Sequence, residues 1–498
     1  MSMIEVAGLT FGYDGSYDII FDNVSFRLDT DWKLGFTGRN GRGKTTFLNL
    51  LLGKYEYRGT IRTSVSFDYF PFPVLHPDWY TADVLEEICC GAELWKLNRE
   101  LNLLEVPDNV RYRPFETLSK GEQTKVLLAA LFLKENNFLL IDEPTNHLDR
   151  HAREVVSRYL NSKRGFILVS HDRAFLDGCV DHILSINKTN IEVQSGNFSS
   201  WLRNKEMQDQ FELAANDKLK KEISRLSAAA KRTSGWSKQV EKTKIGSLNS
   251  GLKPDKGYIG HKAAKMMKRA KIMESRQTAA IEEKSKLLRN LEEAEPLAIH
   301  PLQYRTDVLL EAKDLCLFYG ERQVCGPLNF QVCRGDRVAL CGRNGSGKSS
   351  ILKLILGESL VHTGELRLGS GLVFSYVSQD TSFLTGNLTN FARENGIDES
   401  LFKTILRKLD FSREQFEKNL ESFSEGQKKK VLIAKSLCEP AHLYLWDEPL
   451  NFIDVLSRMQ LEALLTEYRP TMLFVEHDAA FTSAVATKQI DLSGELHE

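Results

Sequence analysis

Short, continuous apolar runs recur through the first and the last parts of the chain. The runs Phe138–Ile141 and Phe166–Val169 each stop at a polar residue, and Leu443–Trp446 and Met472–Val475 do the same near the other end. Runs of this kind are typical of parallel strands that are covered on both faces. Because helix-like segments separate them, the pattern predicts an α/β fold.

The middle of the chain has helical spacing instead. From Trp201 to about Arg232, apolar or small residues recur at Met207, Phe211, Ala215, Leu219, Ile223 and Leu226. A second segment, from about Gly260 to Glu293, has Met266, Met273, Ala280 and Leu287 at seven-residue intervals. Each helix would be about 50 Å long at about 1.5 Å per residue. We expect an antiparallel helical hairpin with a long tip, for which a solvated coiled-coil spacer is the simplest interpretation.

A glycine-rich loop follows the strand-like run Lys33–Thr37, and the same loop returns 304 positions later. Its glycines let backbone N–H groups surround phosphate oxygens at a helix N-terminus. Lys44 and Lys348 would reach the β and γ phosphates of ATP, and the Thr45 and Ser349 hydroxyls can coordinate Mg²⁺. The candidate ATP-binding residues of the two loops are Gly38, Arg39, Asn40, Gly41, Arg42, Gly43, Lys44, Thr45 and Thr46, and Gly342, Arg343, Asn344, Gly345, Ser346, Gly347, Lys348, Ser349 and Ser350.

A carboxylate pair ends one apolar strand in each repeat. These pairs are Asp142-Glu143 and Asp447-Glu448, 305 positions apart. ATP hydrolysis needs one carboxylate near the metal and a second that polarises the attacking water. We assign Asp142 and Asp447 to the metal, and Glu143 and Glu448 to the water.

Another apolar strand leads to a histidine in each repeat, His171 and His477, which are 306 positions apart. An imidazole at this edge of the sheet could orient the γ phosphate and the water. A single histidine here would more often be structural, but its recurrence in both repeats favours the catalytic interpretation.

Charge separates the middle of the chain from the rest. Residues 203–293 contain 22 Lys and Arg against 12 Asp and Glu, whereas the remainder contains 44 against 55. From Lys231 through Arg276 the count is 13 basic residues against three acidic ones. This distribution predicts a polyanionic partner that the middle segment contacts.

Length and composition set further bounds. We expect three domains in the 498 residues, at 1–200, 201–300 and 301–498. The chain has no apolar run of about 18 residues and no signal-peptide pattern, so we expect a cytoplasmic protein. The eight cysteines include no C-x-x-C spacing, and we expect buried, reduced thiols rather than a metal or redox site.

Two further segments complete an ordered motif set. Ser119-Lys120-Gly121 recurs as Ser424-Glu425-Gly426, 305 positions later. With the loops, carboxylates and histidines, these segments resemble the ATP-binding cassette (ABC) superfamily. The resemblance implies a head-to-tail sandwich within one monomer, with each ATP between one phosphate loop and the opposite serine and glycine. One site would combine Lys44, Asp142, Glu143 and His171 with Ser424 and Gly426; the other would combine Lys348, Asp447, Glu448 and His477 with Ser119 and Gly121.

Three other positions follow from the same resemblance. Tyr13 and Tyr319 stand where the superfamily stacks a ring on adenine, although either could be a packed strand-end tyrosine. Gln379 matches the glutamine that contacts Mg²⁺, but the first repeat has Phe72 there. The second repeat departs at Leu450-Asn451-Phe452-Ile453-Asp454, which replaces Thr145-Asn146-His147-Leu148-Asp149. We therefore expect unequal hydrolysis at the two sites.

Tandem cassettes joined by a basic helical linker resemble the ABC-F family, and the tip segment Lys256–Arg269 is similar to the Lsa, Vga and Sal antibiotic-resistance subgroup. The resemblance implies two ABC-type phosphate-loop domains joined by a helical hairpin, with no membrane subunit. The implied partner is the bacterial 70S ribosome, at the 50S exit-tRNA site beside P-site tRNA and the 23S rRNA of the peptidyl-transferase centre. The candidate ribosome-binding residues are Trp236, Lys242, Lys244, Lys253, Lys256, Tyr258, His261, Lys262, Lys265, Lys268 and Arg269.

Three other functions fit parts of the sequence. A housekeeping ABC-F translation factor would have the same cassettes and linker without protecting against antibiotics. A transporter ATPase would leave the basic linker unexplained. A DNA-maintenance ATPase would usually have one cassette split by a coiled coil, not two complete cassettes flanking it.

Overall fold

A computed structural model gives the structure of the protein. It describes residues 2–13, 19–89, 91–134, 137–146, 148–186, 191–211, 297–320 and 322–492, together with 214, 218, 221–222, 224–225, 268 and 272. The chain divides into two compact units, Met1–Trp201 with Ala294–Glu498, and Leu202–Glu293. The first unit contains both repeats, each of which forms one cassette.

Cassette 1 has two sheets. Its six-stranded sheet has the order β5-β6-β7-β3-β8-β9 and is parallel except for β9, which pairs antiparallel with β8. Those strands are β3 (Lys33–Thr37), β5 (Ser66–Phe70), β6 (Asn137–Asp142), β7 (Phe166–Val169), β8 (His182–Ile186) and β9 (Ile191–Ser195). A three-stranded antiparallel sheet has the order β2-β1-β4, with β1 (Met3–Gly12), β2 (Ile19–Asp29) and β4 (Arg58–Arg62). The continuous apolar runs therefore form the buried parallel strands that the sequence predicts.

Cassette 2 repeats this architecture. Its parallel sheet has the order β14-β15-β16-β12-β17, with β12 (Arg337–Cys341), β14 (Phe374–Val377), β15 (Leu443–Asp447), β16 (Met472–Val475) and β17 (Lys488–Asp491). Its antiparallel sheet has the order β11-β10-β13, with β10 (Val308–Tyr319), β11 (Arg322–Cys333) and β13 (Val361–Leu368). The predicted α/β class and the tandem cassettes are confirmed.

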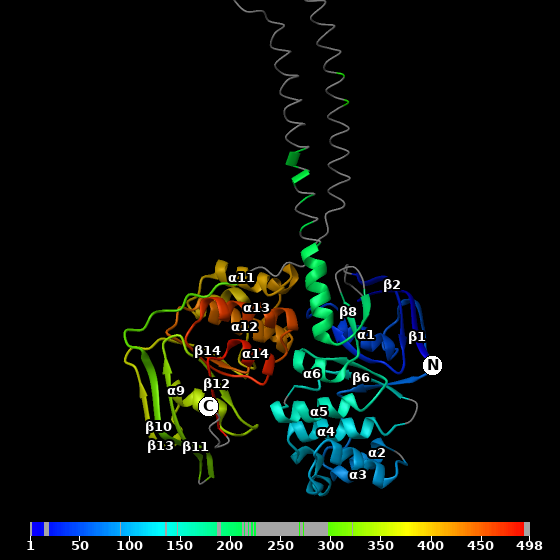
Figure 1. Ribbon diagram of the computed structural model, residues 1–498, viewed down its shortest axis with the longest axis horizontal. Coiled ribbons are helices and arrows are strands. Elements are labelled where there is room, and N and C mark those ends of the chain that lie inside the picture. The colour runs from blue at the N-terminus through cyan, green and yellow to red at the C-terminus, as the bar shows by residue number, and fades with distance from the viewer. Residues whose placement is uncertain are drawn as a thin grey trace, which may run out of the picture. The chain divides into compact units, whose positions relative to one another are not determined.

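Helices pack on these sheets (Figure 1). In cassette 1 they are α1 (Lys44–Leu51), α2 (Thr81–Ile88), α3 (Leu94–Leu103), α4 (Lys120–Leu131), α5 (Arg150–Asn161) and α6 (Arg173–Cys179). In cassette 2 they are α9 (Lys348–Ile355), α10 (Leu388–Glu394), α11 (Glu399–Lys408), α12 (Glu425–Cys438), α13 (Val455–Tyr468) and α14 (Ala479–Val485). No helix in the described ranges has the length and apolar content that a bilayer-spanning segment requires.

Polar motif residues begin several of these helices. Ser119 and Ser424 accept hydrogen bonds from the backbone N–H groups of Glu122 and Gln427, and both form capping boxes at α4 and α12. Asp149 and Asp454 cap α5 and α13 in the same way, and such caps satisfy N–H groups that have no partner inside the helix. The motif residues therefore fix helix starts as well as lining the sites.

A buried arginine–aspartate pair recurs in both cassettes. Arg153 Nη1 lies 2.9 Å from Asp172 Oδ2, and Arg458 Nη1 lies 3.0 Å from Asp478 Oδ2. Arg458 also donates from Nε to the carbonyl of Ile453 at 2.9 Å. In cassette 2 the pair thus ties the loop before α13 to the start of α14.

Replacing Arg458 with methionine should lower the free energy of unfolding of cassette 2 by about 3–5 kcal/mol, because Asp478 would be left buried and unpaired. Burial raises the pKa of Asp478, but Arg458, the Phe481 N–H and Arg173 together outweigh burial, and the pKa lies below its ordinary value. The stabilisation should therefore be present above about pH 3.9, the unfolded aspartate value, and be lost as pH falls through the folded pKa. Chemical denaturation at several pH values measures this.

The exposed pair Arg27–Glu5 supplies the control for that experiment. Its guanidinium is 68% exposed, so Arg27→Met should change the free energy of unfolding by less than about 1 kcal/mol. An equally small change for Arg458→Met would contradict a stabilising role for the buried pair.

Two sequence predictions need correction. The helix predicted to start at Trp201 already includes residues 198–200, and it continues through 211. Among the seven described cysteines, all are free, but Cys316, Cys333, Cys341 and Cys438 are only partly buried, while Cys89, Cys179 and Cys325 are buried. Cys316 lies within β10, and the other three are the last residues of β11, β12 and α12, positions that an apolar run alone does not reveal.

Most of the predicted linker falls outside the described residues. Of the candidate ribosome-binding side chains, Lys268 is described, and it is helical and exposed. The others, Trp236, Lys242, Lys244, Lys253, Lys256, Tyr258, His261, Lys262, Lys265 and Arg269, lie outside the described residues. Their role stays a prediction, as do the domain boundaries at 200 and 300.

Candidate nucleotide-binding sites

The two phosphate loops have the same backbone arrangement. Gly43 (φ 91°) and Gly347 (φ 88°) lie in the left-handed region directly before α1 and α9. A Cβ on Gly43 would also lie 2.6 Å from the Ile20 side chain, so a larger residue would disturb this turn. Glycine at these positions lets the chain turn tightly from strand to helix and leaves the helix N-terminus open to an anion.

The loop lysines are held by carbonyl groups of their own loops. Lys44 Nζ donates to Gly38 O at 2.6 Å and to Arg39 O at 3.1 Å. Lys348 Nζ donates to Gly342 O and Arg343 O, both at 2.9 Å. Burial lowers the pKa of both lysines. Each ammonium is thus fixed at the loop, within reach of phosphates bound there.

A hydroxyl and a carboxylate meet beside each loop. Thr45 Oγ1 donates to Asp142 Oδ2 at 3.0 Å, and Ser349 Oγ donates to Asp447 Oδ1 at 3.1 Å. Burial raises the pKa of Asp142, and it raises the pKa of Asp447 to about 6. Two clustered oxygen ligands of this kind fit Mg²⁺, whose charge would favour the ionised carboxylate.

The glutamates that follow are in a strained backbone conformation. Glu143 has φ 51° and Glu448 has φ 46°, a region that residues other than glycine seldom adopt. Their N–H groups donate to Val169 O at 2.9 Å and Val475 O at 3.0 Å. Such strain costs about 1–3 kcal/mol and clusters at functional sites, where the surrounding structure maintains it.

Each glutamate lies next to the predicted histidine. His171 Nε2 is 3.3 Å from Glu143 Oε1, and His477 Nε2 is 3.4 Å from Glu448 Oε1. Glu143 Oε1 and His477 Nε2 are buried and have no hydrogen-bond partner within the described part of the protein. Buried polar atoms without partners are rare; Glu143 Oε1 is available to accept from a water, and a protonated His477 Nε2 could donate to a water or a phosphate oxygen.

The surroundings of the two glutamates differ. Glu448 Oε2 accepts hydrogen bonds from Gln379 Nε2 at 2.9 Å and from Asn451 Nδ2 at 2.6 Å. Strand register places Phe72 two residues beyond β5, as Gln379 lies two beyond β14, so Glu143 has phenylalanine where Glu448 has an amide donor. In cassette 1 Phe72 therefore occupies the position that Gln379 occupies in cassette 2.

The electrostatics of the glutamates differ accordingly. Burial and the neighbouring Asp142 raise the pKa of Glu143 to about 8. Burial also acts on Glu448, but the adjacent His477 together with Lys348 and Lys429 outweighs it, and the pKa of Glu448 is lowered. At neutral pH, Glu448 is thus the carboxylate that is ready to accept a proton.

Each cavity is lined by both cassettes. The first, of about 930 Å³, brings Asn40, Gly41, Lys44, Thr45, Asp142, Glu143 and His171 together with Ser424 and Gly426. The second, of about 1000 Å³, brings Arg343, Asn344, Gly345, Gly347, Lys348, Ser349, Ser350, Gln379, Glu448 and His477 together with Ser119 and Gly121. This is the head-to-tail arrangement of motifs that the resemblance implies.

Some predicted residues lie beside the cavities without lining them. Arg39 Nη1 is 3.4 Å from Asp410 Oδ1 of cassette 2, and Tyr13 pairs through its hydroxyl with Thr46 Oγ1 at 2.8 Å. Tyr319, by contrast, does line the second cavity, and its hydroxyl lies 3.0 Å from Ser350 Oγ. The other predicted residues that line neither cavity are Gly38, Arg42 and Gly43 of the first loop, and Gly342, Ser346 and Asp447 of the second repeat.

Cassette 2 contacts the phosphate loop of the first site closely. Asn40 Nδ2 donates to Phe452 O at 2.9 Å, and a Cβ on Gly426 would lie 3.1 Å from the same Asn40 nitrogen. Phe452 itself has φ 64°, another strained conformation. In the second site Asn344 N lies 3.4 Å from Asp149 Oδ2 of cassette 1. Phe452, one of the positions at which the second repeat departs from the motif of the first, therefore lies at the interface between the cassettes.

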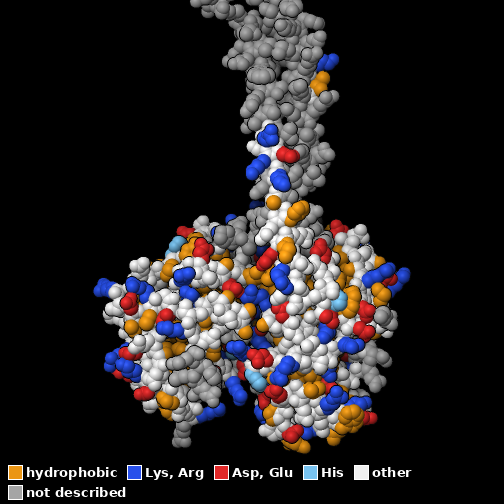
Figure 2. Space-filling model, viewed as in Figure 1, with side chains coloured by type: hydrophobic (Ala, Val, Ile, Leu, Met, Phe, Trp, Pro, Cys, Tyr) orange, Lys and Arg blue, Asp and Glu red, His pale blue; other side chains and the backbone are white. Residues whose placement is uncertain are grey.

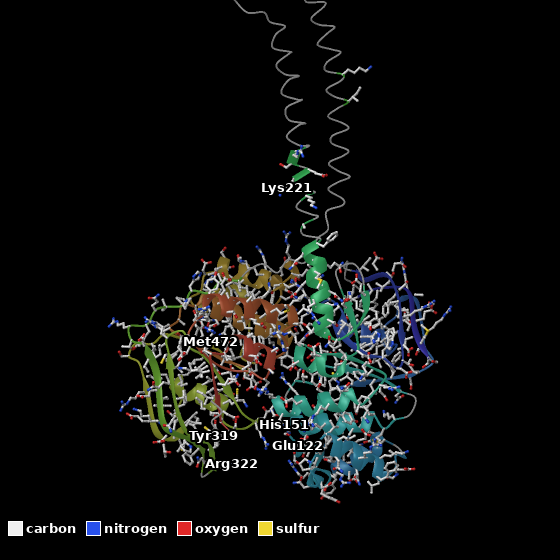
Figure 3. The ribbon with its side chains drawn as sticks, in the orientation of Figure 1. Glu122, His151, Lys221, Tyr319, Arg322 and Met472 are labelled. Carbon is white, nitrogen blue, oxygen red and sulfur yellow. The ribbon has the colours of Figure 1, made fainter. Side chains whose placement is uncertain are left out.

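Sequence reasoning missed two residues that line the second cavity, His151 of cassette 1 and Arg322 of cassette 2. They line it together with Glu122 and the predicted Tyr319 (Figure 3). His151 Nε2 lies 2.9 Å from Glu105 Oε2, and the other carboxylate oxygen of Glu105, Oε1, accepts from Arg158. His151 and Arg322 come from separate segments and belong to no short motif, so only the fold brings them together.

Comparisons with known proteins agree with this geometry. The sequence profile of the family described as ABC transporter matches residues 21–146 and 325–451. The "Ribosome protection protein VmlR" of Bacillus subtilis is 28% identical, covering 99% of this chain and 87% of that protein. The "Energy-dependent translational throttle protein EttA" of Haemophilus influenzae is 26% identical, covering 96% and 89%.

Solved structures share the fold. The archaeal ribosome recycling factor aABCE1, in a complex with the ribosomal stalk protein aP1, matches with a TM-score of 0.64 at 19% identity, covering 98% of this chain and 88% of that one. ABCE1 in a model of ribosome-bound archaeal Pelota and ABCE1 gives 0.61 at 20% identity, covering 98% and 76%. With these relatives the predicted resemblance to ABC-F proteins is confirmed, and the chain belongs to the ABC transporter family as an ATPase with two ATP-binding cassettes.

Proposed function

We propose that this ATPase binds the bacterial ribosome and protects the peptidyl-transferase centre from antibiotics. ATP would close the two cassettes, and closure would present the basic linker at the exit-tRNA site. The observation that carries the ATP-dependent part is that each cavity needs both cassettes, because Lys44 faces Ser424 and Lys348 faces Ser119. A nucleotide in either cavity would join them.

Two further observations support a ribosomal partner. The relatives named above include a ribosome protection protein and a translational throttle protein, and both align over nearly the whole chain. The linker also has 13 basic residues against three acidic ones between Lys231 and Arg276, a density that favours binding to phosphate. The subgroup resemblance in Lys256–Arg269 points to lincosamides, pleuromutilins and group A streptogramins as the drugs concerned.

The residues of each site have separate tasks in this mechanism. The loop N–H groups and Lys44 or Lys348 would bind the β and γ phosphates, and Thr45 with Asp142, or Ser349 with Asp447 and Gln379, would hold Mg²⁺, which neutralises phosphate charge. Glu143 and Glu448 would accept a proton from the attacking water, while His171 and His477 would orient it. Ser119 and Ser424, already fixed at helix starts, would contact the γ phosphate from the opposite cassette.

Expression of the intact chain in a susceptible bacterium should raise the minimum inhibitory concentration of at least one of these drug classes. Replacing Ile245–Tyr258 by a glycine–serine segment of equal length should abolish that protection, because the resemblance to the resistance subgroup implies that the tip approaches the drug site. Ribosome binding and ATP turnover should persist, since the two predicted linker helices and both cassettes are unchanged. Inhibitory concentrations, pelleting with ribosomes and phosphate release measure the three effects.

A housekeeping translation factor is the second candidate, favoured by the full-length similarity to EttA. Protection by neither the intact nor the altered chain, with ribosome binding retained, would support it. Equal protection by both would move the decisive contact away from the tip.

A further inference from the structure

The solvent face of α3 has an unusual composition. The helix packs through Leu97, Glu100 and Leu101, which are buried. On its other side Trp95 is 58% exposed and Leu103 is 47% exposed. Trp95, Asn98, Arg99 and Asn102 follow one another at i, i+3, i+4 and i+7, so they share one face. Figure 2 shows hydrophobic side chains gathered at the end of cassette 1 where Figure 1 labels α2 and α3.

Cassette 2 shows that the fold does not require this face. Its helix α11 (Glu399–Lys408) has the same length as α3 and lies 305 positions later, the spacing of Ser119 and Ser424. The α11 residues that correspond to Trp95, Asn98, Arg99, Asn102 and Leu103 are Ser400, Lys403, Thr404, Arg407 and Lys408. Lys403 pairs with Glu399 along the helix, as expected of a solvated surface. The exposed Trp95 and Leu103 of α3 correspond to polar residues on α11, so they indicate a function of cassette 1 alone.

The same face forms a small, shallow cavity that is largely open to solvent. It has a volume of about 470 Å³, and its walls are Trp95, Asn98, Arg99, Asn102 and Leu103. The Trp95 indole N–H donates to Glu93, and the Lys96 ammonium lies 5.7 Å from the ring centroid, so the ring has a fixed orientation beside a cation. Within the described ranges, the side chains of Arg99 and Asn102 have no hydrogen-bond or ion-pair partner. These groups are thus free to bind a ligand.

We propose that this cavity on α3 binds an unpaired nucleotide of RNA, a proposal that rests on the ribosomal partner proposed above. The base would stack on Trp95, and the Asn98 and Asn102 amides would hydrogen-bond its edge. Arg99, with Lys96 beside the ring, would contact the phosphate. RNA is favoured over a peptide because amides and a guanidinium, with no carboxylate in the walls, surround one ring.

A crosslinking experiment identifies the occupant. Leu103 is one of the cavity walls and is 47% exposed, so a photoreactive phenylalanine at Leu103 would lie at the cavity. The chain carrying this residue, with Glu143→Gln and Glu448→Gln to hold ATP, is irradiated on 70S ribosomes. We expect a crosslink to an unpaired rRNA nucleotide.

Matched substitutions test the side chains themselves. Trp95→Ser with Arg99→Thr introduces the residues of cassette 2 and should weaken ribosome binding at least about fivefold, the low end for loss of one base–aromatic stack. Trp95→Phe keeps a ring and should retain the crosslink. Phe383→Ser removes a ring that is 56% exposed in cassette 2 and should leave binding unchanged. ATP turnover and the melting temperature should match the parent in all three.

The outcomes separate this proposal from the function on which it rests. A crosslink to a ribosomal protein, no crosslink despite pelleting, or full binding by the Trp95→Ser, Arg99→Thr chain would overturn the RNA site alone. If the parent chain does not pellet with ribosomes, the proposed function fails and the RNA site fails with it.

Discussion

Replacing both Glu143 and Glu448 with glutamine should reduce ATP turnover about 100- to 10,000-fold while leaving ATP affinity near that of the parent. Glutamine fills the same space but cannot accept the proton of the attacking water. The loop residues that would bind phosphate, Lys44 and Lys348, hydrogen-bond to loop carbonyls and not to these glutamates, so they stay in place. Phosphate release and nucleotide binding measure the two effects.

The exposed Glu86 of α2 supplies the control, since Glu86→Gln makes the same chemical change away from both cavities. It should leave turnover unchanged. Turnover in the double variant equal to that of Glu86→Gln would exclude the two glutamates as the principal bases.

The single variants should be unequal, with Glu448→Gln reducing turnover at least about tenfold more than Glu143→Gln. Glu448 is held by Gln379 and Asn451 and has a lowered pKa, so it is ionised at neutral pH. Glu143 faces Phe72 instead of an amide, and its pKa of about 8 leaves it mostly protonated. A base that holds its proton cannot take another from water. Steady-state turnover of each variant at pH 7 gives the comparison.

Exchanging the metal-side residue tests the cause of that inequality. Gln379→Phe gives the second site the residue of the first, so its turnover should fall toward that of Glu448→Gln. Equal turnover of the two single glutamine variants, together with parental turnover for Gln379→Phe, would contradict an effect of this position. Strong coupling between the sites would show instead as a large loss from either glutamine alone.

Much of each site could be predicted from the sequence because its parts follow buried strands. Parallel strands end at one edge of the sheet, so residues just beyond β6 and β7, such as Glu143 and His171, must lie close together. Because the chain contains two repeats, each motif could also be compared with its counterpart in the other repeat. This comparison identified Phe72 as a replacement for glutamine, which the strand register bears out.

Contacts between the cassettes could not be predicted in the same way. Asn40 meets Phe452 across 412 positions, and Arg173 pairs with Glu462 across 289. No periodicity or short motif relates such pairs, because they depend on how one folded cassette packs on the other. The different pKa values of Glu143 and Glu448 have the same origin, since burial and neighbouring charges come from several separate segments.

Sedimentation of the double glutamine variant with bacterial 70S ribosomes tests the central claim most directly. ATP should persist in both sites of this variant, hold the cassettes together and keep the chain on the ribosome. We predict that the variant pellets with ribosomes in ATP, that it stays in the supernatant in ADP, and that the parent is released as it hydrolyses ATP. Pelleting that is the same in ATP and ADP, or absent in both, would contradict ATP-dependent ribosome binding.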